Sequence, residues 1–260
     1  ADTAEGAARA GFEALTAALR RLDALVTPSA FLRDAIAARV GAGPRFEVIP
    51  DAVEPVPEAD FATRLWNARA FSALGRLRRA VAAGGAGQGR RLLWFGISGT
   101  KKARNGLYDL ETLTQGLARH HEKAPLSLSI VSDSRPKYAE LFAGAPFPTF
   151  YTDWNYWTFD ACFDGHDIAI LPAGCNDYNW AKSANRLTTA LARGVAVAAT
   201  GIPAYGAFAD CAVLDDWDGG LGALMRDHSD RAARIRVGAA RARANYGPVP
   251  IARRWEELFA

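Results

Sequence analysis

The chain has 260 residues, of which 50% are hydrophobic and 23% are charged, and its formal net charge is +3. This composition is typical of a soluble globular protein of one or two domains, and the small net charge excludes a strongly basic nucleic-acid-binding protein. No apolar run reaches the roughly 20 residues of a membrane span, and no signal peptide is visible. Three cysteines without metal-ligand spacing suit a reducing compartment, so we predict a cytoplasmic protein without a metal site.

Residues 1–55 have the pattern of a partial α/β segment. Because the chain begins with Ala and opens directly into a helical pattern, we expect a processed chain or a piece of a longer protein. Thr27 is the expected N-cap and Pro28 the first residue of a helix that ends at Gly41. The other expected elements are a helix over residues 3–22 and short strands over residues 22–26 and 46–49.

Residues 56–89 form the predicted connector between this segment and the rest of the chain. A stretch rich in proline and acidic residues leads into a helical pattern over residues 61–80, and residues 82–89 are rich in glycine. The expected apolar face of the helix is Phe61, Leu65, Trp66, Phe71 and Leu74.

Strands alternate with helices over residues 90–245, which predicts a doubly wound parallel sheet with helices on both faces. A final helical pattern covers residues 246–260. The expected strands are residues 92–95, 126–131, 148–151, 167–171, 195–199 and 211–214.

The loop over residues 96–106 follows the first of these strands and contains glycines and cations. Its spacing matches neither G-x-x-x-x-G-K-[ST] nor G-x-G-x-x-G, so it supports neither a P-loop ATPase nor an ordinary nicotinamide-dependent enzyme. Gly96 and Gly99 allow a close approach of backbone to ligand. The alternative is an ordinary surface loop. The side chains that offer oxyanion contacts are Ser98, Thr100, Lys101 and Arg104.

The stretch from Asp167 to Ala199 predicts a strand, a loop, a helix and a second strand. Lys182, Ser183, Asn185 and Arg186 open the expected helix. Cations at a helix N-terminus oppose the helix dipole, whereas a bound anion would remove that conflict and Arg can grip phosphate with two hydrogen bonds. The site also follows the carboxyl end of a strand. The alternative is that both cations point into water.

Several motifs together resemble GT-B glycosyltransferases, and in particular their C-terminal, donor-binding half. The resemblance is to the bacterial surface-polysaccharide group with a Lys-Ser-x-Asn-Arg motif, and it covers roughly residues 22–55 and 90–215. The motifs are Trp94-Phe-Gly96, Gly106-Leu-Tyr-Asp-Leu110, Asp167-Ile-Ala-Ile-Leu-Pro172, Lys182-Ser-Ala-Asn-Arg186 and Ala190-Leu-Ala-x-Gly194. In the same fold, residues 25–32 and 48–51 resemble the end of the N-terminal domain, and residues 251–259 resemble a C-terminal helix that crosses back to it.

The resemblance implies a nucleotide-diphosphate sugar as the donor substrate, bound without a metal or other cofactor. Lys182 and Arg186 would hold the diphosphate and stabilise the departing nucleotide, with Ser183 beside them. The implied acceptor is a cell-surface glycan or a lipid-linked glycan. The further implied donor contacts are Gly96, Ser98, Gly99, Thr100, Lys101, Asn176, Asp177 and Asn185, with residues 176–179 facing the sugar.

Two departures from the family pattern leave the function open. Many retaining GT-B enzymes carry two glutamates eight positions apart, where this chain has Ala181 and Thr189. Most of a first Rossmann domain is also absent, so the chain would act with a missing N-terminal domain or a partner chain. A non-catalytic nucleotide- or glycan-binding module is therefore the second hypothesis.

For several other residues or stretches the sequence allows two interpretations each. Asp133 would bind ribose or base, or would cap the next helix. Trp154 and Trp157 would stack on a base, or would pack in the core. The Arg-rich stretch over residues 226–243 would contact an anionic membrane surface, but its aspartates favour a solvated helix face.

Overall fold

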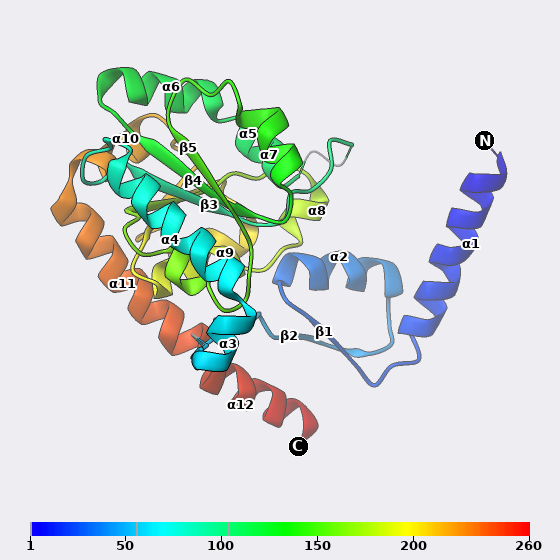
Figure 1. Cartoon of the computed structure of the whole chain (residues 1–260). Helices are drawn as coiled ribbons and strands as arrows, with labels where there is room; N and C mark the ends of the chain where they lie inside the picture. Colours follow the sequence, from blue (N-terminus) through cyan, green and yellow to red (C-terminus); the bar gives the residue numbers. More distant parts are fainter. Residues whose placement is uncertain (1, 56, 103–104) are drawn as a thin grey trace.

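A computed structural model of the chain describes residues 2–55, 57–102 and 105–260. The described residues form two parallel sheets, one of two strands near the N-terminus and one of six strands that begins after residue 90. In Figure 1 the small unit lies beside the larger one, and α1 (Asp2–Leu19) extends away from both. The predicted fold class, a doubly wound α/β sheet with a partial N-terminal α/β segment, is confirmed.

The larger sheet has the strand order β5-β4-β3-β6-β7-β8, and neighbouring strands are parallel throughout. The chain adds β4 and β5 on one side of β3 and then returns to place β6 on the other side. This reversal makes the junction of β3 and β6 a topological switch point, where open α/β sheets bind ligands beyond the strand carboxyl ends. The strands are β3 (Arg91–Phe95), β4 (Ser127–Ser132), β5 (Thr149–Asp153), β6 (Ile168–Leu171), β7 (Ala196–Ala199) and β8 (Val213–Leu214).

Two layers of helices bury the sheet, because side chains alternate along each strand. Leu92 and Trp94 of β3 pack into one layer, formed with α5, α6, α7 and α10, whereas Leu93 and Phe95 pack into the other, formed with α4 and α9 (Figure 1). Both faces of the sheet are thus covered, which explains the continuous apolar strands. The helices are α4 (Ala68–Ala83), α5 (Leu107–Glu111), α6 (Thr114–Lys123), α7 (Arg135–Phe142), α8 (Asp177–Trp180), α9 (Asn185–Ala192), α10 (Gly219–Arg226), α11 (His228–Tyr246) and α12 (Pro248–Phe259), with 3₁₀ turns η1 (Asp160–Cys162) and η2 (Pro203–Phe208).

The small unit consists of β1 (Ala24–Thr27), α2 (Ala30–Val40) and β2 (Arg45–Val48), preceded by α1. The predicted N-cap Thr27 is wrong, because this residue ends β1 and its hydroxyl donates to the Ser29 carbonyl (3.0 Å). Ser29 is the N-cap, and its Oγ accepts from the Leu32 amide (3.2 Å). The helix ends at Gly41 as predicted, in a left-handed conformation with φ of 70°.

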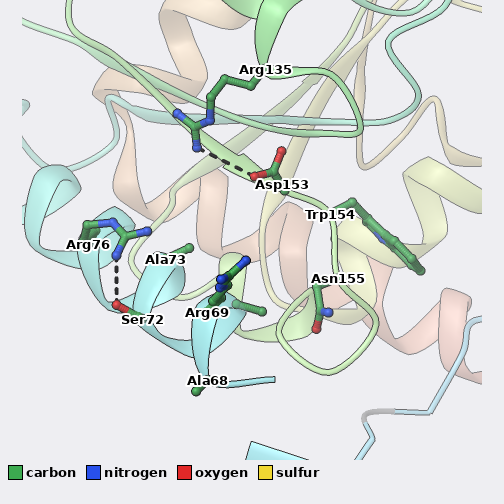
Figure 2. Close-up of a pocket in the computed structure, with 10 residues that line it drawn as sticks. Ala68, Arg69, Ser72, Ala73, Arg76, Arg135, Asp153, Trp154 and Asn155 are labelled. Carbon is green, nitrogen blue, oxygen red and sulfur yellow. Dashed lines mark hydrogen bonds and ion pairs between the residues drawn. The ribbon is translucent and has the colours of Figure 1, made fainter. Parts of the chain in front are cut away.

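The helix predicted over residues 61–80 is two helices, α3 (Phe61–Trp66) and α4, which meet at Asn67. Its predicted apolar face is wrong in α3, where Phe61, Leu65 and Trp66 are 82%, 65% and 88% exposed. Only α4 packs on the sheet, through Leu74, Leu77 and Val81. The opposite side of α4 faces the end of β5 and the start of α7 (Figure 2).

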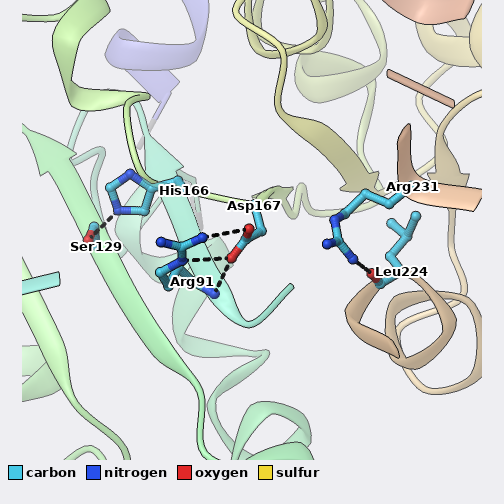
Figure 3. Close-up of polar contacts among 6 residues, drawn as sticks. All are labelled: Arg91, Ser129, His166, Asp167, Leu224 and Arg231. Carbon is cyan, nitrogen blue, oxygen red and sulfur yellow. Dashed lines mark hydrogen bonds and ion pairs between the residues drawn. The ribbon is translucent and has the colours of Figure 1, made fainter. Parts of the chain in front are cut away.

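Polar contacts join β3, β4 and β6 near the strand starts (Figure 3), and among the described residues only the Nδ1 atom of the buried His166 lacks a partner in this group. Asp167 precedes β6, and its carboxylate accepts three hydrogen bonds from the backbone and guanidinium of Arg91, at 2.9–3.1 Å. His166 Nε2 lies 2.7 Å from Ser129 Oγ of β4, so two consecutive residues tie β6 to both β3 and β4. None of the described helices is long and apolar enough to cross a membrane.

His166 gives the fold a pH dependence of known sign. Burial lowers the pKa of its imidazole from 6.5 to about 4. The unfolded chain therefore takes up a proton near pH 6.5 that the folded chain takes up only near pH 4, so stability is lost as the pH falls through this window. We expect protonation of this residue to lower the unfolding free energy by up to about 1.4 kcal/mol for each pH unit within this window.

Urea unfolding of His166→Gln between pH 7 and pH 4 measures this contribution. The variant should lose stability less steeply than the native chain as the pH falls, whereas His228→Gln, an exposed histidine at the start of α11, should leave the slope unchanged. An equal slope in His166→Gln and the native chain would contradict the assignment.

Candidate functional site

Two loops meet at the switch point, one after β3 and one after β6. The loop after β3 is anchored to the end of β4: the Ser98 amide donates to Asp133 Oδ1 (2.6 Å), and Lys137 Nζ donates to Ser98 Oγ (3.1 Å) and to the Gly99 carbonyl. Burial acts to raise the pKa of Asp133, but the hydrogen bonds from Ser98, from its own backbone and from Ser132 together outweigh it and the pKa is lowered. Asp133 is thus a carboxylate that holds the loop, and its contact with a ribose stays a prediction.

Glycines in this loop are required by the loop's own packing. Gly99 and Gly106 have φ of 67° and 71°, which residues with a Cβ rarely adopt. A Cβ on Gly99 would lie 2.2 Å from the Asn105 carbonyl oxygen, and one on Gly106 would lie 2.3 Å from that of Ile97. The Thr100 amide donates to Asn105 Oδ1 (2.8 Å), Lys101 is exposed, and Arg104 lies outside the described residues.

The helix after β6 begins later than the motif suggests. α9 starts at Asn185, after an N-cap, Ala184, that has no side-chain acceptor. Lys182 and Ser183 therefore lie in the preceding loop, and Asn185 and Arg186 are in the first turn of the helix. The Asn185 amide donates to Ser183 Oγ (3.4 Å), and the helix dipole places partial positive charge at this end beside the two cations.

Arg186 is the most unusual group in the site. Part of its side chain reaches the surface, but Nε and Nη2 are buried and have no hydrogen-bond partner among the described residues. Its guanidinium carbon lies 5.1 Å and 5.4 Å from the ring centroids of Trp94 and Phe95, and a Cβ on Gly96 would lie 3.4 Å from it. Burial lowers the pKa of Arg186. A buried guanidinium without a partner costs stability, and an anion would satisfy it.

Lys182 approaches the same place from the loop. Its Nζ donates to Asn179 Oδ1 and lies 4.7 Å from the centroid of the Tyr178 ring. Burial, and then the positive charge of Arg186, lower the pKa of Lys182. The two cations predicted from the sequence are therefore electrostatically coupled, as a site for one anion requires.

Asp109 is a site residue that the sequence analysis missed. Its buried carboxylate accepts from the Gly106 amide (3.1 Å) in the first loop and from the Gly174 amide (2.9 Å) in the second. Burial raises its pKa, against the hydrogen bond from Gly174 and the charges of Lys182 and Arg186. Asp109 thus ties the two loops together beneath the cations. Its position three residues after a helix N-cap was the available signal.

The remaining predicted residues form hydrogen bonds within or next to the second loop, or are exposed. Ser183 Oγ donates to Asp51, which ties the loop to the N-terminal unit. Asn176 caps α8 by accepting from the Asn179 amide (2.9 Å), and Asn185 Oδ1 accepts from Thr189 Oγ1 (3.1 Å). Asp177 is exposed. Ligand contacts of these residues stay predictions.

Two cavities meet at Arg186. One, of about 530 Å³, lies between the second loop and the N-terminal unit, and the other, of about 200 Å³, lies against the segment after β5. Within the described residues, no group of three His, Cys, Asp or Glu side chains is arranged to hold a metal ion. The first cavity includes Pro28, Leu32, Asp51, Tyr178, Lys182, Ser183 and Tyr205, and the second includes Phe95, Trp154, Tyr156, Phe159, Thr189 and Arg193.

Removal of the unpaired guanidinium should stabilise the unliganded protein. Arg186→Met keeps a flexible side chain against Trp94 and Phe95, and we expect it to raise the unfolding free energy by about 1–3 kcal/mol. Arg193→Met is the control, because Arg193 pairs with the largely buried Asp160 and its loss should destabilise the fold. Denaturant unfolding measures both. A less stable Arg186→Met protein would show that Arg186 is a structural residue.

Comparisons with known proteins agree with this architecture. No family model and no curated protein sequence matches the chain. Among solved structures, it resembles HepE of Anabaena in complex with UDP and glucose (TM-score 0.65, 13% identity, 93% of this chain and 64% of that one). It also resembles sucrose-phosphate synthase of Thermosynechococcus elongatus (0.61, 15%, 94% and 59%) and the trehalose 6-phosphate synthase of Burkholderia multivorans (0.59, 15%, 95% and 61%).

These neighbours are GT-B glycosyltransferases, and the chain spans about three-fifths of their length. At 13–15% identity, the likeness shows the fold. The chain therefore has the α/β architecture of the GT-B fold, with a six-stranded parallel sheet and part of a second unit.

Proposed function

We propose that the chain is the donor-binding part of a glycosyltransferase that takes its sugar from a nucleotide-diphosphate sugar. The observation that carries the proposal is the buried, unpartnered guanidinium of Arg186 at the switch point of the sheet. Lys182 lines the same cavity, and the dipole at the start of α9 adds to the positive potential. The neighbours in complex with UDP and with UDP-glucose share this fold, which makes a nucleotide-sugar the natural ligand class.

In this proposal, Arg186 and Lys182 hold the diphosphate and act as the catalytic cations. When the bond between sugar and diphosphate breaks, negative charge grows on the leaving nucleotide. Cations fixed in place before the reaction stabilise that charge more than they stabilise the bound donor. The 530 Å³ cavity beside Tyr178 would take the sugar, with residues 176–179 facing it.

The rest of the enzyme would come from a further α/β domain on the N-terminal unit, on the same chain or on a partner chain. A two-stranded sheet is marginal alone, and β1 and β2 pair only with each other among the described strands. On α1, Phe12 and Leu15 are 51% and 57% exposed. This further domain would hold the acceptor and the general base. We propose that the acceptor is a cell-surface or lipid-linked glycan at the inner membrane face.

The second candidate is a non-catalytic nucleotide- or glycan-binding module. The observation in its favour is that Ala181 and Thr189 stand where many retaining GT-B enzymes have glutamates, and that Thr189 Oγ1 is already bonded to Asn185. The two candidates share nucleotide binding and differ in turnover.

Nucleotide binding is tested by calorimetry with UDP, GDP, ADP, CDP and dTDP. We expect one of these to bind, and Lys182→Ala and Arg186→Ala each to weaken it by about 1.5–3 kcal/mol, the range of a charged hydrogen bond. Arg236→Ala removes an exposed arginine from α11 and should leave the affinity unchanged. Binding that survives both site variants would refute the proposed role of the two cations.

Turnover separates the enzyme from the binding module. With the missing domain supplied, the enzyme should release nucleoside diphosphate from its donor by transfer or slow hydrolysis, and Arg186→Ala should abolish that release. We would measure it with the donor whose nucleotide binds. A complex that binds the donor and releases no diphosphate over a long incubation would establish the binding module instead.

A further inference from the structure

A second arginine-lined cavity lies outside the site described above. It has a volume of about 630 Å³ and lies where β5 ends, between α4 and the start of α7 (Figure 2). It is thus at the ligand-binding edge of the sheet, displaced outward from the switch point. Trp154, the residue after β5, lines both this cavity and the 200 Å³ cavity that contains Arg186, so the two are neighbours.

One stripe of α4 forms the floor of the cavity. Arg69, Ser72, Ala73 and Arg76 follow one another at intervals of three, one and three residues, which places them on one face of the helix. Ser72 and Ala73 lie between the two arginines, and their small side chains leave space for the cavity above the helix. The opposite face carries the buried leucines of α4, so the helix cannot turn to bring this stripe elsewhere. The core packing therefore fixes which face of α4 lines the cavity, and the two arginine side chains on that face are exposed.

Positive charge in this cavity is not balanced. Three arginines line it, and Asp153 is the one carboxylate among its described lining residues. Asp153 lies 3.8 Å from Arg135, whose guanidinium is also held 4.7 Å from the centroid of the Tyr151 ring. Arg76 donates only to Ser72 (2.8 Å), and Arg69 forms no ion pair within the described part of the chain. The three arginines are exposed at the rim of one cavity and outnumber its carboxylate, which favours the binding of an anion there.

The geometry points to a binding site for a small phosphomonoester, with Arg69, Arg76 and Arg135 around the phosphate. Guanidinium groups bind phosphate with paired hydrogen bonds, and the planar fork of arginine suits its oxygens better than lysine does. Trp154 is 52% exposed and offers a flat apolar face to the organic part of the same molecule. The identification of this molecule as the second substrate of the enzyme rests on the proposed function, whereas its binding in this cavity does not.

Calorimetric titration with ribose 5-phosphate, with ribose as the uncharged control, tests the site. Ribose 5-phosphate should bind and ribose should not. The double variant Arg69→Ala, Arg76→Ala should weaken binding by about ten- to hundredfold, and Trp154→Ala should weaken ribose 5-phosphate more than inorganic phosphate. Arg79→Ala removes an arginine from the same helix outside the cavity and should have no effect.

The same titration on Arg186→Ala separates the two sites. Ribose 5-phosphate should bind this variant with unchanged affinity, even if no nucleotide binds the native chain. Affinity lost in Arg186→Ala, affinity lost equally in Arg79→Ala, or no binding of ribose 5-phosphate to the native chain would each overturn the assignment.

Discussion

The edge of the sheet beyond the carboxyl ends of the strands depends on one buried guanidinium that has no hydrogen-bond partner in the described part of the chain. Arg186 is fixed by the first turn of α9, and α9 is fixed because Leu187, Ala190 and Leu191 are buried on the sheet. The rings of Trp94 and Phe95 lie against the guanidinium but offer no hydrogen-bond acceptor to it. The core therefore sustains a charge whose Nε and Nη2 have no hydrogen-bond partner among the described residues, which is the arrangement expected where stability is exchanged for a preformed anion site.

Topology explains why this charge lies where two loops can reach it. After β5 the chain crosses to the other side of β3 and forms β6 there. The loops after β3 and β6 therefore lead to opposite helix layers and leave a gap between them. Asp109 spans that gap with one hydrogen bond to each loop. Its negative charge also offsets part of the repulsion between Lys182 and Arg186. One buried carboxylate thus sets the spacing of the loops and makes the pair of cations tolerable.

Local patterns in the sequence predicted the sheet and the two cations, because short apolar strands and a motif at a helix start are local signals. They did not predict the contacts that close the site. Lys137 reaches Ser98 over 39 positions and Asp109 reaches Gly174 over 65, and neither pairing has a sequence period. The errors at Thr27 and in α3 have a similar cause. Thr27 is held in a strand by β2, and the apolar pattern of α3 is correct for a helix but has no surface here to cover.

The N-terminal unit forms hydrogen bonds with the loop that carries Lys182. Ser29 Oγ donates to the Ala181 carbonyl (2.7 Å), and Ser183 donates to Asp51. These bonds flank Lys182 on both sides, so a displacement of the unit would move the lysine or break both. A ligand that holds Lys182 in place therefore also favours one orientation of the unit, and the reverse follows by linkage. In the proposed enzyme, whatever covers the surface of β1 and α1 would in this way influence the affinity for the donor.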